Sequence, residues 1–215
     1  MARGVFITLE GVEGSGKTTH AAVLADVLRS DTREVILTRE PGGTPAGRAI
    51  RNIFLDPNVS LDVVSELLLV LADRAQHVRE ELKPAVERGA IVISDRYCDS
   101  TIAYQGYGRG LDLDLLRSLN RLATDSTMPD LTIVLDCSVA TGLARTRERV
   151  KGQAHAFDRF ESEREEFHKR VRAGFLEIAN RDTDRVVVIS SERPRDIVSQ
   201  DILATVRALL ERRCL

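Results

Sequence analysis

Residues 11–18, Gly-Val-Glu-Gly-Ser-Gly-Lys-Thr, constrain this chain more than any other stretch, because they match the phosphate-loop pattern G-x-x-x-x-G-K-[ST]. An apolar run at residues 5–9 precedes the loop, and apolar residues at helical spacing follow it from Lys17 to Arg29. Glycines let such a loop turn its backbone N–H groups toward an anion, at the positive end of the helix dipole. The pattern predicts a protein that binds the phosphates of ATP or GTP. A glycine-rich turn that binds nothing is the less favoured interpretation.

The residue types within the loop predict how a nucleotide is held. In phosphate loops the lysine reaches the β- and γ-phosphates, and the hydroxyl residue after it holds Mg²⁺. We therefore expect Lys17 to be a catalytic cation and Thr18 to be a metal ligand. The guanine signature Asn-Lys-x-Asp is absent from the sequence, which counts against a GTPase. The residues expected to bind the nucleotide are Gly11, Val12, Glu13, Gly14, Ser15, Gly16, Lys17, Thr18 and Thr19.

Four further short apolar segments predict strands, at residues 34–38, 90–94, 131–135 and 186–189. They are mostly apolar throughout rather than alternating, and helical patterns separate them, which indicates a parallel sheet covered on both faces. The expected fold is therefore a doubly wound α/β fold with five parallel strands. Ligands of such folds bind beyond the carboxyl ends of the strands, where Arg39, Asp95 and Asp136 are expected to lie beside the loop.

Capping signals place the helices between these strands. Ser30 and Asp31 are expected to end the first helix, and Thr44-Pro45 to begin the next one after a turn at residues 39–43. A long helix is predicted from about residues 60–62 to Gly89, with a disturbance at Pro84. The buried face of a later helix is predicted to contain Phe160, Phe167, Val171, Phe175 and Ile178.

Length and charge exclude several classes of protein. A chain of 215 residues is most simply a single domain, residues 1–215. The 31 basic residues are balanced by 33 acidic ones, so we expect neither a nucleic acid nor a membrane as partner. The three cysteines lie far apart without a C-x-x-C motif, residues 1–10 do not resemble a signal peptide, and the longest apolar run is too short to span a membrane. These features favour a cytoplasmic protein.

The pair Asp95-Arg96 ends the third predicted strand. A carboxylate there can orient water around Mg²⁺, and a guanidinium group can bind a phosphate through two parallel hydrogen bonds. A structural ion pair at the strand end is the alternative interpretation. The presence of the phosphate loop favours the interpretation that this pair binds metal and phosphate. We therefore expect Asp95 to be a metal ligand together with Thr18.

The densest basic cluster consists of Arg145, Arg147, Arg149 and Lys151. Arg145 and Arg149 are four residues apart, so on a helix they share one face and repel each other unless an anion lies between them. A solvated helix surface is the alternative, but phosphoryl transfer needs cations near the γ-phosphate. We expect residues 142–161 to form a small flap that also excludes water. The four histidines share no motif, and no role is assigned to them.

Five stretches in the same order resemble the thymidylate kinase family. They are residues 9–19 (Leu-Glu-Gly-Val-Glu-Gly-Ser-Gly-Lys-Thr-Thr), 38–44 (Thr-Arg-Glu-Pro-Gly-Gly-Thr), 72–76 (Ala-Asp-Arg-Ala-Gln), 95–97 (Asp-Arg-Tyr) and 100–106 (Ser-Thr-Ile-Ala-Tyr-Gln-Gly). The resemblance extends along nearly the whole chain. It implies a phosphate-loop nucleoside-monophosphate-kinase fold and transfer of a phosphoryl group from ATP to dTMP with Mg²⁺, for dTTP synthesis. It also implies a homodimer.

The resemblance assigns roles to the residues expected to hold dTMP. Glu13 matches an acidic residue near the sugar 3′-hydroxyl, and Arg39 and Arg96 match arginines that hold the acceptor phosphate. Tyr104 matches a tyrosine under the deoxyribose, where a 2′-hydroxyl would collide with it. The residues implied at the thymine edge are Arg74, Thr101 and Gln105, and Glu40 and Arg51 complete the expected acceptor site.

The family places its catalytic arginine either in the phosphate loop or in the flap. This chain has Gly14-Ser15 at the loop position, so it resembles the bacterial type with the arginine in the flap. Within the flap we expect Arg149 to be catalytic, with Arg147 as the second choice and Arg145 near adenine. The full set of expected catalytic residues is Lys17, Arg149, Arg147 and Arg96.

One position departs from the family pattern. Four residues before Arg74 the family usually has a phenylalanine that stacks on thymine, and this chain has Val70. Loss of a stacked ring removes roughly 1–3 kcal/mol of binding. We therefore expect either weaker dTMP binding or compensation by another apolar side chain. Two alternatives to a dTMP kinase stay open, a related phosphate-loop kinase with another small acceptor and a non-catalytic ATP-binding switch.

Overall fold

The computed structural model describes residues 3–29, 34–151 and 158–213. Its sheet has five strands that are all parallel, in the order β2-β3-β1-β4-β5. Each strand agrees with its predicted segment to within one residue at either end, which confirms the expected doubly wound α/β fold. The strands are β1 (Val5–Glu10), β2 (Val35–Arg39), β3 (Ile91–Asp95), β4 (Leu131–Asp136) and β5 (Val186–Ser190).

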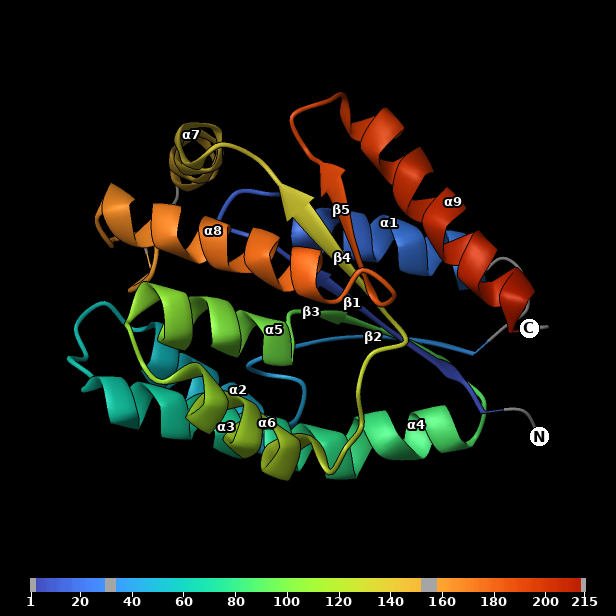
Figure 1. Ribbon diagram of the computed structural model, residues 1–215, viewed down its shortest axis with the longest axis horizontal. Helices are drawn as coiled ribbons and strands as arrows, with labels where there is room; N and C mark the ends of the chain where they lie inside the picture. The colour runs from blue at the N-terminus through green and yellow to red at the C-terminus, as the bar shows by residue number, and fades with distance from the viewer. Residues whose placement is uncertain (1–2, 30–33, 152–157, 214–215) are drawn as a thin grey trace.

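Helices connect the strands and surround the sheet (Figure 1). Thr44 and Asp62 begin two of them as N-caps, accepting hydrogen bonds from the backbone N–H groups of Gly47 (3.0 Å) and Val64 (2.8 Å). The helices are α1 (Lys17–Arg29), α2 (Pro45–Leu55), α3 (Val63–His77), η1 (Val78–Leu82), α4 (Lys83–Glu87), α5 (Cys98–Thr101), η2 (Ile102–Gly108), α6 (Leu113–Thr124), α7 (Val139–Val150), α8 (Glu165–Arg181) and α9 (Arg195–Arg212).

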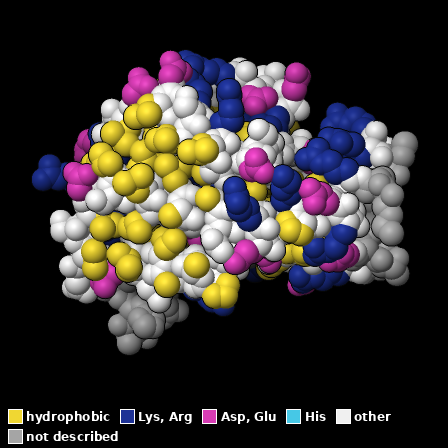
Figure 2. All heavy atoms as spheres, turned by 90° about the horizontal axis from the view of Figure 1, so that it is seen from below, with side chains coloured by type: hydrophobic (Ala, Val, Ile, Leu, Met, Phe, Trp, Pro, Cys, Tyr) yellow, Lys and Arg dark blue, Asp and Glu magenta, His cyan; other side chains and the backbone are white. Residues whose placement is uncertain are grey.

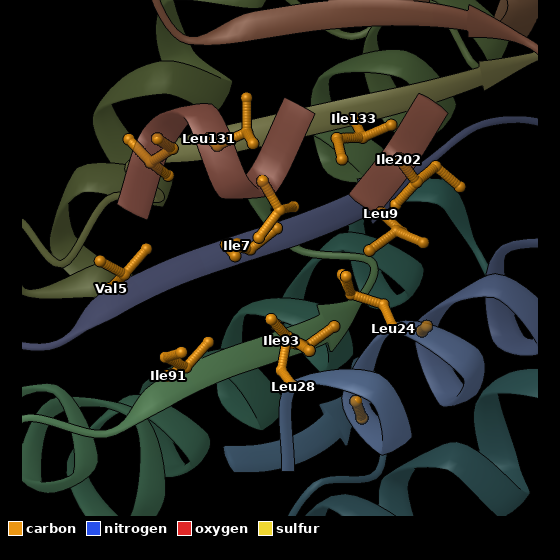
Figure 3. Packing of buried hydrophobic residues seen from close by; sticks show 14 of the residues in the cluster. Val5, Ile7, Leu9, Leu24, Leu28, Ile91, Ile93, Leu131, Ile133 and Ile202 are labelled. Carbon is orange, nitrogen blue, oxygen red and sulfur yellow. The ribbon is translucent and has the colours of Figure 1, made fainter. Parts of the chain in front are cut away.

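The apolar core lies on both faces of the sheet because successive side chains of a strand point to opposite faces. On one face Val5, Ile7 and Leu9 of β1 pack toward α1 and α9, against residues such as Leu24 and Ile202 (Figure 3). All of these side chains are buried. This packing fixes β1 in the middle of the sheet, with the phosphate loop at its carboxyl end.

The other face is covered in two parts (Figure 1). Phe6 of β1 packs against η1 and α4, where it belongs to the same cluster as Leu82 and Val86. Val134 of β4 belongs to a second cluster, which includes Phe175 of α8 and residues of α2, α3, η2 and α6. The sheet is therefore covered on both faces, as its apolar strands predict.

One helix prediction needs correction, and another gains detail. The long helix toward Gly89 is interrupted near Pro84, as predicted, because α3 passes into the π-helical η1 before α4. Pro84 lacks an N–H group, and its ring crowds the carbonyl four residues earlier, so the wider turn precedes it. Phe160 is buried but lies in a turn before α8 rather than on that helix. The proposed end of the first helix at Ser30 and Asp31 lies outside the described residues.

The expected flap at residues 142–161 is in part a helix. Residues up to Val150 belong to α7, and residues 158–161 form a turn that precedes α8. Residues 152–157 of the expected flap lie outside the described residues. Within the described part of the chain, no helix has both the length and the apolar composition that a membrane span requires.

Candidate active site

A cavity opens at the carboxyl ends of β1, β2 and β3. Its walls come from the phosphate loop, the turn after β2, α2, α3, η2 and the turn before α8. Of the predicted site residues, Glu13, Gly14, Lys17, Thr18, Arg39, Glu40, Arg51, Val70, Arg74, Asp95, Arg96, Thr101, Tyr104, Gln105 and Arg149 line this cavity. Gly11, Val12, Ser15, Gly16, Thr19, Arg145 and Arg147 are outside its lining. The structure thus brings the phosphate loop, the expected acceptor residues and one flap arginine into a single cavity.

Lys17 is buried at the base of the phosphate loop. Its Nζ atom donates hydrogen bonds to the carbonyl oxygen of Val12 (2.7 Å) and to Oγ of Ser15 (3.3 Å). Burial and the nearby Arg96 guanidinium lower the pKa of Lys17 to about 8. A bound phosphate group would favour the charged lysine again, so the loop is suited to an anion.

Gly14 explains why the phosphate loop holds no arginine. Its φ is 70°, a left-handed conformation that favours glycine, and a Cβ atom at this position would overlap the carbonyl oxygen of Gly142 in α7. The reverse contact is equally close, because a Cβ atom on Gly142 would overlap the carbonyl oxygen of Glu13. The phosphate loop and α7 are therefore packed backbone to backbone, and no side chain fits at position 14 without moving the helix.

Thr18 and Asp95 lie together, and the Thr18 hydroxyl donates a hydrogen bond to the Asp95 carboxylate. Hydroxyl and carboxylate oxygens are the ligands that Mg²⁺ prefers, and Mg²⁺ sites of kinases commonly use one or two protein oxygens together with substrate phosphates. No cluster of three or more histidine, cysteine or acidic residues suited to a metal occurs among the described residues. The pair therefore fits Mg²⁺ held jointly with a nucleotide, rather than a metal bound by protein alone.

Glu13 is the centre of a buried hydrogen-bond network next to the loop. Its carboxylate accepts hydrogen bonds from the Tyr104 hydroxyl and from Nη2 of Arg96 (3.1 Å), and it is paired with Nδ1 of His168 (3.2 Å). Burial opposes the charge on Glu13, but His168, Arg96, Lys17 and Tyr104 together lower its pKa to about 2. Glu13 is therefore a fixed carboxylate that faces the cavity.

Arg96 lies between the phosphate loop and the acceptor side of the cavity. Its Nη1 atom donates to the carbonyl oxygen of Gly11 (3.2 Å) and to Oγ of Ser100 (3.1 Å), and its guanidinium group lies 4.8 Å from the centre of the Tyr104 ring. The backbone of Arg96 has φ 76°, which is uncommon for a residue other than glycine and is found most often at functional sites. This conformation and these contacts hold its positive charge at the cavity wall.

Arg74 is a second immobilised cation, with 2% of its side chain exposed. Its Nε atom donates to Glu40 (2.8 Å), and its Nη1 atom donates to Oγ1 of Thr101 (2.9 Å) and to Oδ1 of Asn120. Glu40 in turn is paired with Nδ1 of His77 (2.9 Å). Because three hydrogen bonds from its Nε and Nη1 atoms fix the guanidinium group, Arg74 can present only one orientation to a ligand.

Two further arginines line the mouth of the cavity. Arg39 and Asp95 are neighbours in the strand register, at the adjacent ends of β2 and β3. Nη1 of Arg51 donates a hydrogen bond to the carbonyl oxygen of Pro41 (2.9 Å). Burial and the proximity of Arg39 lower the pKa of Arg51. An anionic acceptor bound between them would relieve this repulsion.

The flap arginines occupy three different environments. Arg149 lines the cavity and forms an ion pair with Glu161. Arg145 lies beside the phosphate loop, where it donates to the carbonyl oxygens of Ser191 (2.9 Å) and Gly14 (3.5 Å). Arg147 is exposed and outside the cavity lining.

Several site residues were not predicted from the sequence. Asp136, which was expected at the loop edge, does lie at the end of β4, but it pairs with Arg172 and is outside the cavity lining. Some unpredicted lining residues lie within stretches that resemble the family, so for these the sequence offered a signal; they are Pro41, Asp73, Tyr97 and Ser100. The other unpredicted lining residues are Phe54, Leu55, Asp158, Phe160 and Glu161, and behind them lie Glu66, His77, Asn120 and His168.

The fold and the cavity together define a class of protein. A phosphate loop at the carboxyl edge of a doubly wound sheet, with arginines from five separate segments converging on the same cavity, is the arrangement of a phosphate-loop kinase.

Comparisons with known proteins identify the family. The family model described as thymidylate kinase matches residues 9–202. The chain is 46% identical to the thymidylate kinase of Halothermothrix orenii over 210 residues, 97% of this chain and 99% of that protein. It is 48% identical to the thymidylate kinase of Deinococcus radiodurans over 206 residues, 96% of this chain and 98% of that protein. The chain therefore belongs to the thymidylate kinase family.

A solved structure agrees with this assignment. The crystal structure of thymidylate kinase from Ehrlichia chaffeensis matches with a TM-score of 0.77 and 36% identity, covering 95% of this chain and 99% of that one. The resemblance, the kinase fold and the enzyme class predicted from the sequence are confirmed.

Proposed function

We propose that this protein transfers the γ-phosphoryl group of ATP to dTMP, forming ADP and dTDP. Family membership supports this reaction. The observation that carries the proposal is that the phosphate loop shares one cavity with Arg74, Thr101, Tyr104 and Gln105, which the sequence assigns to the acceptor nucleotide.

The reaction requires positioning and charge neutralisation rather than a general base. The second pKa of a phosphate monoester is about 6, so the acceptor oxygen is already ionised near neutral pH. Lys17, Arg96 and Arg149 face the same cavity and would stabilise the charge on the transferred group. Thr18 and Asp95 would hold Mg²⁺, which supplies further charge neutralisation when bound.

The sugar of the acceptor would be selected by Glu13 and Tyr104. The Glu13 carboxylate can accept a hydrogen bond from the 3′-hydroxyl, and the Tyr104 hydroxyl is held by the same carboxylate. Because this bond fixes the tyrosine ring, a 2′-hydroxyl would meet a side chain that cannot move aside. Buried polar groups committed to one substrate reject its analogues strongly.

Residues 142–161 would act as the flap that delivers Arg149, with Arg145 toward adenine. The close backbone packing of Gly14 against Gly142 supports this arrangement, because it leaves the flap as the source of the catalytic arginine. The whole chain would then act as one kinase domain in the cytoplasm.

A homodimer is the proposed assembly, with a second copy of this chain as the partner. Exposed apolar side chains gather on the face formed by α2, α3 and α6, which Figure 2 views directly. Large exposed apolar patches of this kind mark protein–protein contact sites. The patch, called the α3/α6 face below, consists of Ile53, Val64, Leu68, Leu115 and Leu122.

Identification of the products tests the reaction. With ATP, Mg²⁺ and dTMP, chromatography should show dTDP and ADP formed in equal amounts, and Lys17→Ala should abolish both. A kinase with another acceptor would leave dTMP unchanged. A non-catalytic ATP-binding switch would bind ATP but release no ADP in response to dTMP.

A further inference from the structure

Glu66 of α3 is a buried carboxylate outside the predicted site, with 1% of its side chain exposed. It accepts hydrogen bonds from three side chains that come from different parts of the chain. These are Nε2 of Gln105 (2.7 Å), Nη2 of Arg109 (3.0 Å) and Nη1 of Arg159 (2.7 Å). Glu66 therefore joins α3, the end of η2 and the turn before α8.

The two arginines hold Glu66 in place. The guanidinium of Arg109 lies 4.6 Å from the ring centre of Phe167, and that of Arg159 lies 4.7 Å from the ring centre of Phe160. A carboxylate that is ion-paired with two guanidinium groups has no proton to donate, so it acts only as an acceptor.

This contact fixes the orientation of the Gln105 amide. Because an amide offers NH₂ donors on one side and a carbonyl acceptor on the other, the NH₂ group must face Glu66. Gln105 lines the cavity, and among the described residues no group donates to its Oε1 atom. The side chain is therefore left with an unpartnered carbonyl acceptor at the cavity wall.

A fixed acceptor distinguishes between pyrimidine bases. Thymine and uracil have an N3–H donor on the edge that pairs in nucleic acids, whereas cytosine has an unprotonated N3 acceptor at that position. An acceptor held opposite N3 accepts a hydrogen bond from thymine and opposes the lone pair of cytosine. Burial of two facing acceptors without a proton between them is costly.

We propose that Glu66 is a positioning residue for base selection, which fixes the Gln105 amide so that its carbonyl oxygen accepts a hydrogen bond from the N3–H group of the base. The inference rests on the proposed dTMP kinase activity and deepens it. Glu66 itself does not touch the base, because it is outside the cavity lining and acts through Gln105.

The test compares kcat/KM for dTMP, dUMP and dCMP in the wild type and in Glu66→Gln. In the variant, the new amide can donate a hydrogen bond to the Gln105 carbonyl oxygen. The Gln105 amide can then rotate so that its NH₂ group and its carbonyl oxygen exchange places. The dTMP and dUMP values should fall together while the dCMP value does not, so that the dTMP-to-dCMP ratio falls by about tenfold to a hundredfold. An equal loss for all three acceptors would overturn the proposal, since it would show a structural role alone.

Arg109→Lys is the matched control. It weakens the same buried cluster but retains the contact between Glu66 and Gln105, so the dTMP-to-dCMP ratio should stay at the wild-type value. A fall in this ratio equal to that of Glu66→Gln would contradict the proposal, because it would assign the effect to the cluster as a whole.

Gln105→Met keeps the test decisive if Glu66→Gln does not fold. Removing the amide should lower the dTMP-to-dCMP ratio by about the same factor, and adding Glu66→Gln to a folded Gln105→Met protein should not lower it further. An unchanged ratio in Gln105→Met would overturn the proposal. Failure of the proposed function is distinguishable, because the wild type would then show no dTMP-dependent ADP formation.

Discussion

The guanidinium group of Arg149, in the last turn of α7, forms an ion pair with the carboxylate of Glu161 at the cavity wall. Glu161 is almost fully buried, whereas Arg149 is more than half exposed. The buried carboxylate thus holds an exposed cation at the cavity that contains the phosphate loop. A nucleotide γ-phosphate bound there would compete with Glu161 for the same guanidinium group.

Arg149→Ala tests the assignment of the catalytic arginine. An arginine placed on the transferred group contributes about 10³–10⁵ to the rate, so turnover should fall by at least about 10³-fold, while the KM for dTMP changes little. Steady-state kinetics, with one substrate varied while the other is in excess, measures both the turnover number and the KM for dTMP. Arg147→Ala is the control, since Arg147 is exposed and outside the cavity, and it should retain most of the activity. Full turnover in Arg149→Ala would move the catalytic role to another flap residue.

We expect Phe54 to compensate for the ring that is missing at Val70. Both residues line the cavity, and the ring centre of Phe54 lies 5.0 Å from that of Phe160. Phe54→Leu should raise the KM for dTMP by about tenfold or more, the value of one lost stacking contact. Val70→Phe should then leave the KM nearly unchanged. A lower KM in Val70→Phe, with no effect of Phe54→Leu, would show that the missing ring is not replaced.

His77 gives the stability of the protein a specific pH dependence. Burial opposes its charge, but hydrogen bonds to Glu40 and Glu81 raise its pKa from 6.5 to about 9. Between these values the folded state binds more protons than the unfolded state, so stability falls as pH rises. The loss due to His77 should reach up to about 3 kcal/mol between pH 6.5 and 9.

Urea denaturation of the wild type and His77→Gln at several pH values measures this effect. The difference between the two proteins isolates His77 from other groups that titrate, such as Glu10, whose pKa burial and Asp99 raise to about 7, and Lys17. The difference should be largest below pH 6.5 and should shrink toward pH 9. A difference that is independent of pH would show that His77 is not charged in the folded protein.

The α3/α6 face should hold the proposed dimer together. Leu68 of α3 is 57% exposed, and a glutamate there would place a charge within the apolar contact. Leu68→Glu should therefore be a monomer by light scattering at concentrations where the wild type is a dimer. Val188→Glu is a matched control on β5, away from this face, and should behave like the wild type. A dimer that persists in Leu68→Glu would place the interface elsewhere.

The sheet and the phosphate loop could be predicted from the sequence because their signals are local. Each strand is a short apolar run between turn residues, and the loop pattern fixes a backbone conformation through neighbouring glycines. The π-helical turn before Pro84 was predicted only as a disturbance. Proline predicts that a helix is interrupted, but the surrounding packing decides how the backbone accommodates it.

The buried residues that hold the cavity-lining side chains in place could not be predicted in the same way. Glu66 and Gln105 are 39 residues apart, and His168 and Glu13 are 155 residues apart. No periodicity or motif links such pairs, since they meet only after the sheet and its covering helices have packed together. The resemblance to a family supplied the residues that are expected to bind the ligand, whereas the residues that hold them in place required the structure.

The acceptor preference of the wild type tests the central claim most directly. ADP formation should be measured side by side with dTMP, dUMP, the ribose form of TMP, dCMP and dGMP. We predict that kcat/KM for dTMP exceeds the values for the ribose form, dCMP and dGMP by at least about 10²-fold. A higher kcat/KM for another acceptor, or ADP release at the same rate with no acceptor at all, would contradict the proposed function.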